Sequence, residues 1–359
     1  MKQNRVERIL LELKKMGISQ MLLVDPISIY YVTGIYQEPD ERFYGLLLKA
    51  NGKHIYFLNK LFSIHQEVGI EKVWYSDTDP VMEIVAQYIE HEAPLGVDKE
   101  LKAKFLLPLQ ERKAASEFIN TSLAVDSVRG IKDAEEQEKM RVSSRINDRA
   151  MERFKELIHE GVTEKEAAEK MLKIYLDLGA DGFSFHPLVA FGANAADPHH
   201  SPDDTVLQEG DVILFDVGCI KDGYCSDMTR SFFFRRVTDV HREIYETVRE
   251  ANETAIARIK PGVPLCDLDL AARKVIEQKG YGPNFNHRLG HFIGLRAHEF
   301  GDVSGVNPQT AQPGMIFSIE PGIYLAGDMG VRIEDLVLVT ETGCEVLNHY
   351  SKKLEIIEG

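Results

Sequence analysis

The chain has 359 residues, of which 44% are apolar and 28% charged, and its 42 Lys and Arg against 57 Asp and Glu give a formal charge of −15. This balance is typical of a globular protein and excludes collagen-like, disordered and disulfide-scaffold classes, and the length predicts two domains, or one large domain plus a smaller one. The acidity, with no basic stripe to neutralise phosphates, also argues against nucleic acid as a partner.

Targeting signals and cysteine pairs are not apparent. The N-terminal residues lack the apolar core of a signal peptide, and no run of about 18 apolar residues occurs, so we expect a cytoplasmic protein that does not bind membranes. The cysteines form no CxxC pair, and we expect them to be small buried residues without a ligand or disulfide role. They are Cys219, Cys225, Cys266 and Cys344.

The first part of the chain alternates helical and strand patterns. Apolar residues at helical spacing predict a helix that ends at Gly17. Asn51-Gly52 lies between two apolar runs and predicts a hairpin. The elements predicted around these signals are strands at 21–24, 46–49, 54–58 and 95–98 and a helix at 79–90.

A change in charge divides the chain. Residues 1–124 carry 15 basic and 17 acidic side chains, whereas residues 125–359 carry 27 and 40. We therefore predict a small α/β domain over 1–124 and an acidic α+β domain over 125–359.

Two capping boxes open the second part. Asp133 with Glu136 predicts a helix that runs to about His159, and Thr163 with Glu166 predicts one that ends before Gly179. Strands follow, and then a second helix pair at about 239–260 and 267–279, followed by strands again. The recurrence suggests an internal duplication.

The segment 210–234 has the pattern of a hairpin whose turn is Asp222-Gly223. A two-residue loop places Asp216 opposite Thr229, with Asp227 as a diagonal neighbour on the same face. Apolar residues share that face, so these carboxylates would lie beside a core and need a counter-charge, which a metal supplies. The alternative is that the face of the hairpin with Asp216 and Asp227 is exposed to solvent and binds no metal.

A second pair of carboxylates follows. Glu320 ends an apolar run just before a Pro-Gly turn, and Glu334 lies within the strand-like run 330–339. Alternation sends Arg332 and Glu334 to one face of that strand. The alternative is a Glu334–Arg332 surface pair on an edge strand.

Histidines lie between and before these carboxylates, at His199, His200, His287, His291 and His298. An oxygen-rich set with an imidazole suits hard-to-borderline divalent ions, with Mn²⁺ or Co²⁺ ahead of a thiolate-type Zn²⁺ site. Four carboxylates would balance two dications. A two-metal centre activates water and polarises a carbonyl oxygen, so the pattern indicates a hydrolase.

Five residues, in their order and contexts, resemble the ligand set of the two-metal "pita-bread" peptidases, the superfamily of methionine aminopeptidase, aminopeptidase P and prolidase. They are Asp216, Asp227, His291, Glu320 and Glu334. The stretches DPHHSPDD, GYCSDMTR and HRLGH are most similar to short bacterial Xaa-Pro dipeptidases, and residues 1–124 resemble the creatinase-like domain that precedes the catalytic domain in such enzymes.

The resemblance implies a role for each residue. Asp216 holds one metal, Asp227 and Glu334 bridge both, and His291 and Glu320 complete the second. A bridging hydroxide attacks the scissile carbonyl with Glu320 as proton shuttle. The resemblance makes His199 the substrate-site histidine, with His200 the poorer candidate, and His298 the histidine that stabilises the tetrahedral intermediate. His287 is implied to be another active-site histidine. Arg332 is implied to orient the last ligand, and Arg288 to bind the carboxylate of a dipeptide.

The resemblance further implies a homodimeric dipeptidase that hydrolyses the imide bond of Xaa-Pro dipeptides with two divalent ions, Mn²⁺ before Co²⁺ or Zn²⁺. An aminopeptidase P acting on longer Xaa-Pro peptides and an inactive pita-bread binding protein are the alternatives. One departure is Phe292, which follows His291 where many relatives have Gly and is expected to narrow the pocket.

Overall fold

The computed structural model describes residues 1–359, which divide into two units, Met1–Arg129 and Gly130–Gly359. The division predicted from the charge shift, after residue 124, falls within helix α5 (Ser122–Gly130). None of the helices is both long and apolar enough to cross a bilayer.

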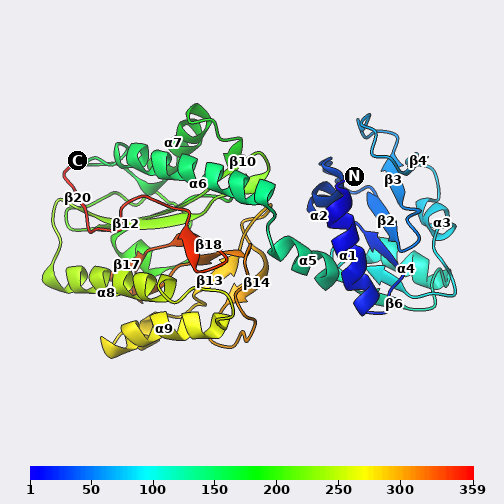
Figure 1. The fold of residues 1–359 in the computed structure, drawn as a ribbon. Helices are drawn as coiled ribbons and strands as arrows, with labels where there is room; N and C mark the ends of the chain where they lie inside the picture. The colour runs from blue at the N-terminus through cyan, green and yellow to red at the C-terminus, as the bar shows by residue number, and fades with distance from the viewer. The chain divides into compact units, whose positions relative to one another are not determined.

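The first unit is a six-stranded mixed sheet in the order β4-β3-β2-β1-β5-β6 with helices beside it (Figure 1). The predicted hairpin is confirmed, because β2 and β3 pair antiparallel around Asn51-Gly52. The helix predicted at 79–90 is shorter than expected. The elements are α1 (Gln3–Lys15), β1 (Gln20–Leu23), α2 (Pro26–Thr33), β2 (Gly45–Lys49), β3 (Ile55–Asn59), β4 (Glu71–Tyr75), α3 (Val81–Ala86), β5 (Leu95–Val97), α4 (Ala103–Glu111), β6 (Phe118–Asn120) and α5 (Ser122–Gly130).

The second unit repeats a helix pair followed by strands. Its first half comprises α6 (Ala134–Lys155), α7 (Glu164–Asp177), β7 (Gly182–Phe183), β8 (Leu188–Phe191), the 3₁₀ turn η1 (Gly192–Ala196), β9 (Val212–Val217), β10 (Cys219–Lys221), β11 (Tyr224–Cys225) and β12 (Met228–Phe234). Its second half comprises α8 (Asp239–Ile256), α9 (Leu265–Gln278), η2 (Gly282–Asn284), β13 (Gly290–Phe292), β14 (Glu299–Val303), β15 (Ile316–Ile319), β16 (Gly322–Leu325), β17 (Met329–Arg332), β18 (Asp335–Val339), β19 (Cys344–Val346) and β20 (Ile356–Ile357).

Local sequence signals explain the helix starts. Both predicted capping boxes are present, with the side chains of Asp133 and Thr163 accepting from the backbone N–H groups of Glu136 and Glu166. Each box satisfies two backbone donors that the first turn of a helix leaves unpaired. The first of these helices, α6, ends at Lys155, a turn earlier than predicted.

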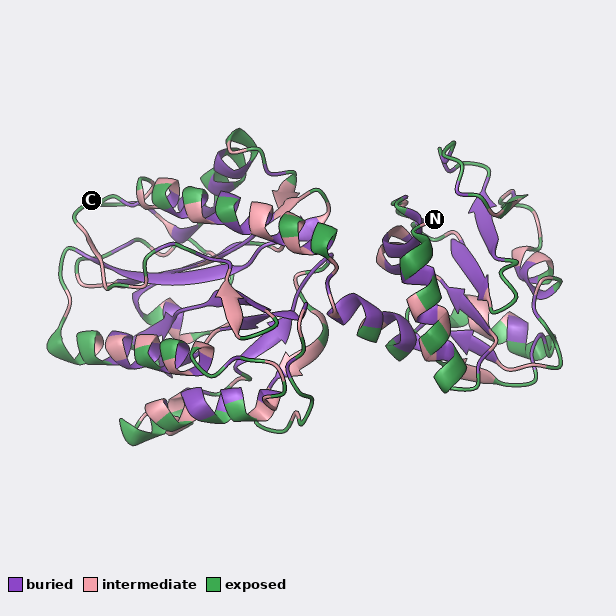
Figure 2. Ribbon diagram, viewed as in Figure 1, coloured by how far each residue is buried: buried purple, intermediate pink, exposed green.

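Two cores sandwich the strands of the second unit. One face of the β20-β12-β9-β8 sheet packs against α6 and α7, and its other face joins the core that contains α8, α9 and the β14-β13-β15-β18-β19 sheet. Figure 2 shows the central strands of these sheets buried, namely β8, β9, β12, β15 and β18, and the outer sides of these helices exposed. Since side chains alternate along a strand, residues of β9 that face the second core point between the two sheets.

Arg230 links the two sheets from β12. Its side chain is 1% exposed, and it donates to the backbone oxygen of Glu334 at 2.6 Å, to Asp335 Oδ1 at 2.7 Å and to the backbone oxygen of Tyr350 at 2.9 Å. These bonds fix the β17–β18 connection against β12. A buried guanidinium whose donors are all used is costly to remove, because its partners then stay buried and unpaired.

We predict that Arg230→Met lowers the free energy of unfolding of the second unit by about 3 kcal/mol or more. The control is Arg236→Met, since Arg236 pairs with Glu209 in solvent and its side chain is 66% exposed; its cost should stay below about 0.5 kcal/mol. Urea unfolding measures both. Equal midpoints for the two variants would contradict the structural role given to Arg230.

Candidate active site

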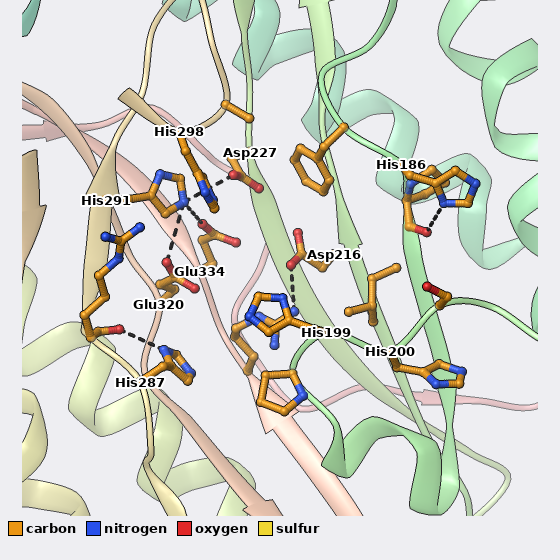
Figure 3. A pocket seen from close by; sticks show the side chains of 18 residues that line it. His186, His199, His200, Asp216, Asp227, His287, His291, His298, Glu320 and Glu334 are labelled. Atoms are coloured by element: carbon orange, nitrogen blue, oxygen red, sulfur yellow. Dashed lines mark hydrogen bonds and ion pairs between the residues drawn. The ribbon is translucent and has the colours of Figure 1, made fainter. Parts of the chain in front are cut away.

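A pocket of about 650 Å³ in the second unit collects every residue predicted for the site (Figure 3). Its volume is in the range of small-molecule binding sites. The predicted residues that line it are Asp216, Asp227, His291, Glu320 and Glu334, with His199, His200, His287, His298, Arg288 and Arg332.

The β9–β12 hairpin positions the first two carboxylates. The predicted register is confirmed, because Asp216 pairs with Thr229, and the turn at Asp222-Gly223 lies between the paired strands β10 and β11. Asp227 precedes β12 and is 3% exposed. A solvated sheet face is therefore excluded for Asp227.

Glu334 is placed differently from the prediction. It lies between β17 and β18, which belong to two different sheets, and not within one continuous strand. Its backbone N–H donates to the Thr229 oxygen at 3.1 Å, and its Oε2 accepts from Thr229 Oγ1 at 2.7 Å. The alternative of a Glu334–Arg332 surface pair is wrong, since both residues are buried and the Arg332 guanidinium instead donates to Asp216 Oδ2 at 2.6 Å.

His291 lies at the centre of the acidic group. Its Nε2 is 3.6 Å from Asp227 Oδ2, 3.5 Å from Glu320 Oε1 and 4.0 Å from Glu334 Oε1. These separations are too long for hydrogen bonds. They are close to the spacing of roughly 3 to 3.5 Å expected between ligands that each lie about 2.1 Å from one cation.

Three buried carboxylate oxygens have no hydrogen-bond partner: Asp216 Oδ1, Asp227 Oδ1 and Glu334 Oε1. Buried polar atoms without partners are rare in folded proteins, because each loses its bonds to water and gains none. Asp227, His291 and Glu334 also place ligand atoms within 4.8 Å of one another. The residues present therefore fit a divalent cation site.

The pKa shifts of the site residues are consistent with a site that binds a cation. Burial, followed by the charges of neighbouring carboxylates, raises the pKa of Asp227 and of Glu334 well above their usual range. Burial likewise raises the pKa of Glu320 to about 7. Burial lowers the pKa of His291 to about 3, so its imidazole is neutral and its Nε2 lone pair is free to bind a cation.

A chain of hydrogen bonds joins one side of the pocket to Asp216. Arg332 donates to Asp216, to Thr229 Oγ1 at 3.1 Å and to Tyr324 Oη at 2.9 Å. Tyr324 Oη lies 2.9 Å from His287 Nε2, and His287 Nδ1 donates to the Arg288 backbone oxygen at 2.8 Å. Burial and the Arg332 charge lower the pKa of His287 to about 4, so the neutral ring accepts from the Tyr324 hydroxyl.

Sequence reasoning missed Tyr324 as a site residue. Ser318, which donates to Glu320 Oε1 at 3.2 Å and accepts from the His291 N–H at 3.0 Å, was also missed. Both lie within two to four residues of Glu320, at alternating positions of the strands that flank the Pro-Gly turn. That proximity was the only available signal.

The other histidines occupy distinct places. The His298 ring lies 4.0 Å from that of His291, centroid to centroid, and burial, with the charge of Arg288, lowers its pKa. His199 faces the carboxylates in Figure 3, whereas His200 points away from them. Arg288 is exposed at the pocket and forms no salt bridge within the chain.

Phe292 does not narrow the pocket as expected. It follows His291 in β13, so its side chain takes the opposite face of the strand. It is 2% exposed and packs on Phe317 in the core, with ring centroids 5.6 Å apart.

The fold and the acidic pocket define the class as a metallopeptidase of the α+β pita-bread type. Residues 138–341 match the model of metallopeptidase family M24, and residues 5–131 match the creatinase/prolidase N-terminal domain. The chain therefore belongs to metallopeptidase family M24, and the resemblance and fold class inferred from the sequence are confirmed.

Full-length relatives support this assignment. An uncharacterized peptidase of Staphylococcus aureus is 37% identical over 97% of this chain and 99% of its own length. Among solved structures, a recombinant prolidase from Thermococcus sibiricus is 32% identical with a TM-score of 0.94, covering 99% of both chains. An X-Pro aminopeptidase from Thermotoga maritima is 29% identical with a TM-score of 0.85, covering 97% of this chain and all (100%) of that one.

We predict that the chelated protein becomes less stable as pH rises. A carboxyl with a raised folded-state pKa, such as Glu320 at about 7 against 4.5, stabilises the fold fully below 4.5, and this contribution is lost as pH rises through about 7. The melting temperature of the chelated protein should therefore fall, relative to the metal-loaded protein, between about pH 5 and pH 8. Calorimetry with and without chelator measures the difference.

Asp227→Asn should raise the melting temperature of the chelated protein at about pH 8 by roughly 2 °C or more, because it removes one of the repelling buried charges. Glu341→Gln removes the same formal charge from an exposed position and serves as the control with no expected change. A lower melting temperature for Asp227→Asn under chelation would mean that this carboxylate stabilises the fold without metal.

Proposed function

We propose that this chain is a dinuclear-metal peptidase that hydrolyses the imide bond of Xaa-Pro dipeptides. The observation that carries the proposal is the set of three unpartnered carboxylate oxygens, from Asp216, Asp227 and Glu334, in one pocket with His291. The match to family M24 supports peptide hydrolysis as the reaction.

The proposed metal ligands are Asp216, Asp227, His291, Glu320 and Glu334. Four carboxylates against the single buried charge of Arg332 leave three negative charges, more than one dication would balance. Oxygen ligands with one neutral imidazole favour Mn²⁺, with Co²⁺ or Zn²⁺ as alternatives. Two such ions, when bound, supply an activated water and polarise a carbonyl oxygen.

Glu320 is proposed to carry the proton. Its carboxylate lies in the pocket beside His291, where it is placed to take a proton and return it. The leaving nitrogen of proline needs that proton to depart as an amine when the C–N bond breaks. Ser318 Oγ, 3.2 Å from Glu320 Oε1, holds the carboxylate in place.

The histidines have separate proposed roles. His298, kept neutral by burial, donates a hydrogen bond to the carbonyl oxygen as it gains charge. His199 contacts the substrate from the opposite side of the pocket. His287 has both ring nitrogens engaged by the Arg288 oxygen and the Tyr324 hydroxyl, and it therefore orients the segment that carries Arg288. Arg332 orients Asp216.

Arg288 is the proposed partner of the substrate's C-terminal carboxylate. Its guanidinium lines the pocket and has no salt bridge within the chain, so it is available to bind a carboxylate in a bidentate manner. A free carboxylate directly after proline is the feature that distinguishes a dipeptide. The second candidate, an X-Pro aminopeptidase acting on longer peptides, is favoured by the similarity to the Thermotoga maritima structure.

We predict that chelation abolishes hydrolysis of Leu-Pro and that Mn²⁺ restores it. Wild-type protein should cleave Leu-Pro with a kcat/KM at least about tenfold above that for Leu-Pro-Gly, because only the dipeptide presents its carboxylate to Arg288. Product analysis by chromatography measures both. Efficient cleavage of the tripeptide would favour the aminopeptidase. If added Mn²⁺ restored cleavage of neither peptide, the proposed function would be overturned.

Arg288→Ala should lower kcat/KM for Leu-Pro by about 10- to 100-fold, mostly through KM, since a charged hydrogen-bonded pair is lost. The matched comparison is Leu-Pro amide, which has no carboxylate and should respond to Arg288→Ala by less than about threefold. Similar losses on both peptides would show that Arg288 supports the pocket without binding the carboxylate.

A further inference from the structure

Outside the acidic group, Glu164 is a carboxylate that the reaction does not use. It is the first residue of α7 and is fully buried, with 0% exposure. Its Oε1 accepts from the Phe191 backbone N–H at 2.7 Å and from Asn194 Nδ2 at 3.0 Å. Its Oε2 accepts from the Asp203 backbone N–H at 3.1 Å and from His200 Nε2 at 2.6 Å.

All four donors belong to one segment, residues 191–203, which leaves β8 and returns toward β9. After η1 this segment forms no helix or strand, so no hydrogen-bond ladder holds it in place. A buried carboxylate that collects four donors from a single connection replaces that ladder. Glu164 is therefore the anchor of this segment on α7.

The anchored segment presents His199 to the pocket. Asp197, Pro198, His199 and His200 form a turn in which the His200 N–H donates to the Asp197 oxygen at 3.2 Å and the His199 N–H donates to Asp197 Oδ1 at 2.9 Å. Pro suits the second position of such a turn and Asp the first. His199 is thus at the third position, and His200 at the fourth position is held by Glu164.

The two histidines point in opposite directions. In Figure 3 the His199 ring lies toward Asp216, whereas the His200 ring lies on the far side of the segment. The sequence offers both as candidates, but only His199 faces the carboxylates. The hydrogen bond from His200 to Glu164 therefore holds the turn on the side opposite to His199, the residue that faces the substrate.

A cation site is the rival interpretation of this group. Glu164, His200 and Asp203 place ligand atoms within 4.8 Å of one another. However, each Glu164 oxygen already accepts two hydrogen bonds, and the Asp203 side chain is exposed and accepts from the Thr205 N–H at 2.7 Å. Asp203 contributes its backbone N–H to the anchor, and its carboxylate is not part of it.

We propose that Glu164, acting through His200, is a positioning residue that fixes His199 in the pocket. The proposal rests on the proposed function for the role of His199 toward a peptide substrate. Because a misplacement of about 1 Å in a substrate-positioning group costs up to roughly 100-fold in rate, the bond between Glu164 and His200 should be measurable in catalysis.

The first test compares two substitutions at one position. His200→Ala should lower kcat/KM for Leu-Pro by about tenfold, whereas His200→Gln, which retains a donor near the Nε2 position, should recover to within about threefold of wild type. Asp203→Asn is the control, since it keeps the backbone donor and should leave kcat/KM unchanged. Equal losses for Ala and Gln, or a large loss for Asp203→Asn, would overturn the proposal.

A double-mutant cycle separates positioning from general damage. If His200 acts through His199, then adding His200→Ala to a His199→Ala variant should lower kcat/KM by no more than about twofold. A full additional tenfold loss would show that His200 acts independently of His199 and would overturn the proposal.

Amide hydrogen exchange does not depend on catalysis and therefore tests this proposal separately from the proposed function. In the metal-free protein, His200→Ala should increase amide hydrogen exchange across residues 191–203 while exchange in β9 and β12 stays as in wild type. Glu164→Gln should have the same effect more strongly if it folds. Unchanged exchange in His200→Ala would overturn the anchor, whereas increased exchange in a protein that cleaves no Xaa-Pro peptide would refute only the proposed function.

Discussion

The structure depends on one electrostatic constraint, the concentration of four carboxylates in a pocket where water cannot solvate them all. Charges taken out of water are costly unless opposite charges or hydrogen bonds replace their hydration. Here Arg332 neutralises Asp216, and Thr229 and Ser318 bond to Glu334 and Glu320. Three carboxylate oxygens remain without a hydrogen-bond partner, so the side chains of the protein do not by themselves compensate the buried negative charge.

The rest of the second unit holds that arrangement together. Two sheets and two helix pairs bury cores on either side of β9 and β12, and Arg230 ties the β17–β18 connection to β12. Repelling side chains would separate if they stood on mobile loops. Here the packing of the surrounding strands keeps them within ligand distance, which is how an unfavourable apo site becomes a favourable cation site.

The pocket is also asymmetric in charge. Asp227, Glu320 and Glu334 surround His291, whereas the Arg288 guanidinium lines the same pocket and forms a salt bridge with none of them. A short peptide carries an anionic carboxylate at one end, and Arg288 is the proposed partner of that group. The segment that Glu164 anchors carries His199, which lies outside any helix or strand. Such a histidine can act on a substrate only if its position is fixed.

Local signals in the sequence determined several elements by themselves. Both capping boxes, the Asn51-Gly52 hairpin and the register that pairs Asp216 with Thr229 follow from residue types at fixed spacing, because turns and caps are set by a few neighbouring side chains. The residues expected to form the site were also identified from their order in the chain, and all of them line one pocket.

Only the tertiary structure decided how these pieces meet. Alternation along one strand put Glu334 beside Arg332, but the chain changes sheets at that point, and Arg332 reaches Asp216, 116 positions away in sequence. Phe292 turned into the core, and Glu164 bonded to a segment that begins 27 residues later. Contacts of this kind depend on packing between distant elements, and no local pattern of residues encodes them.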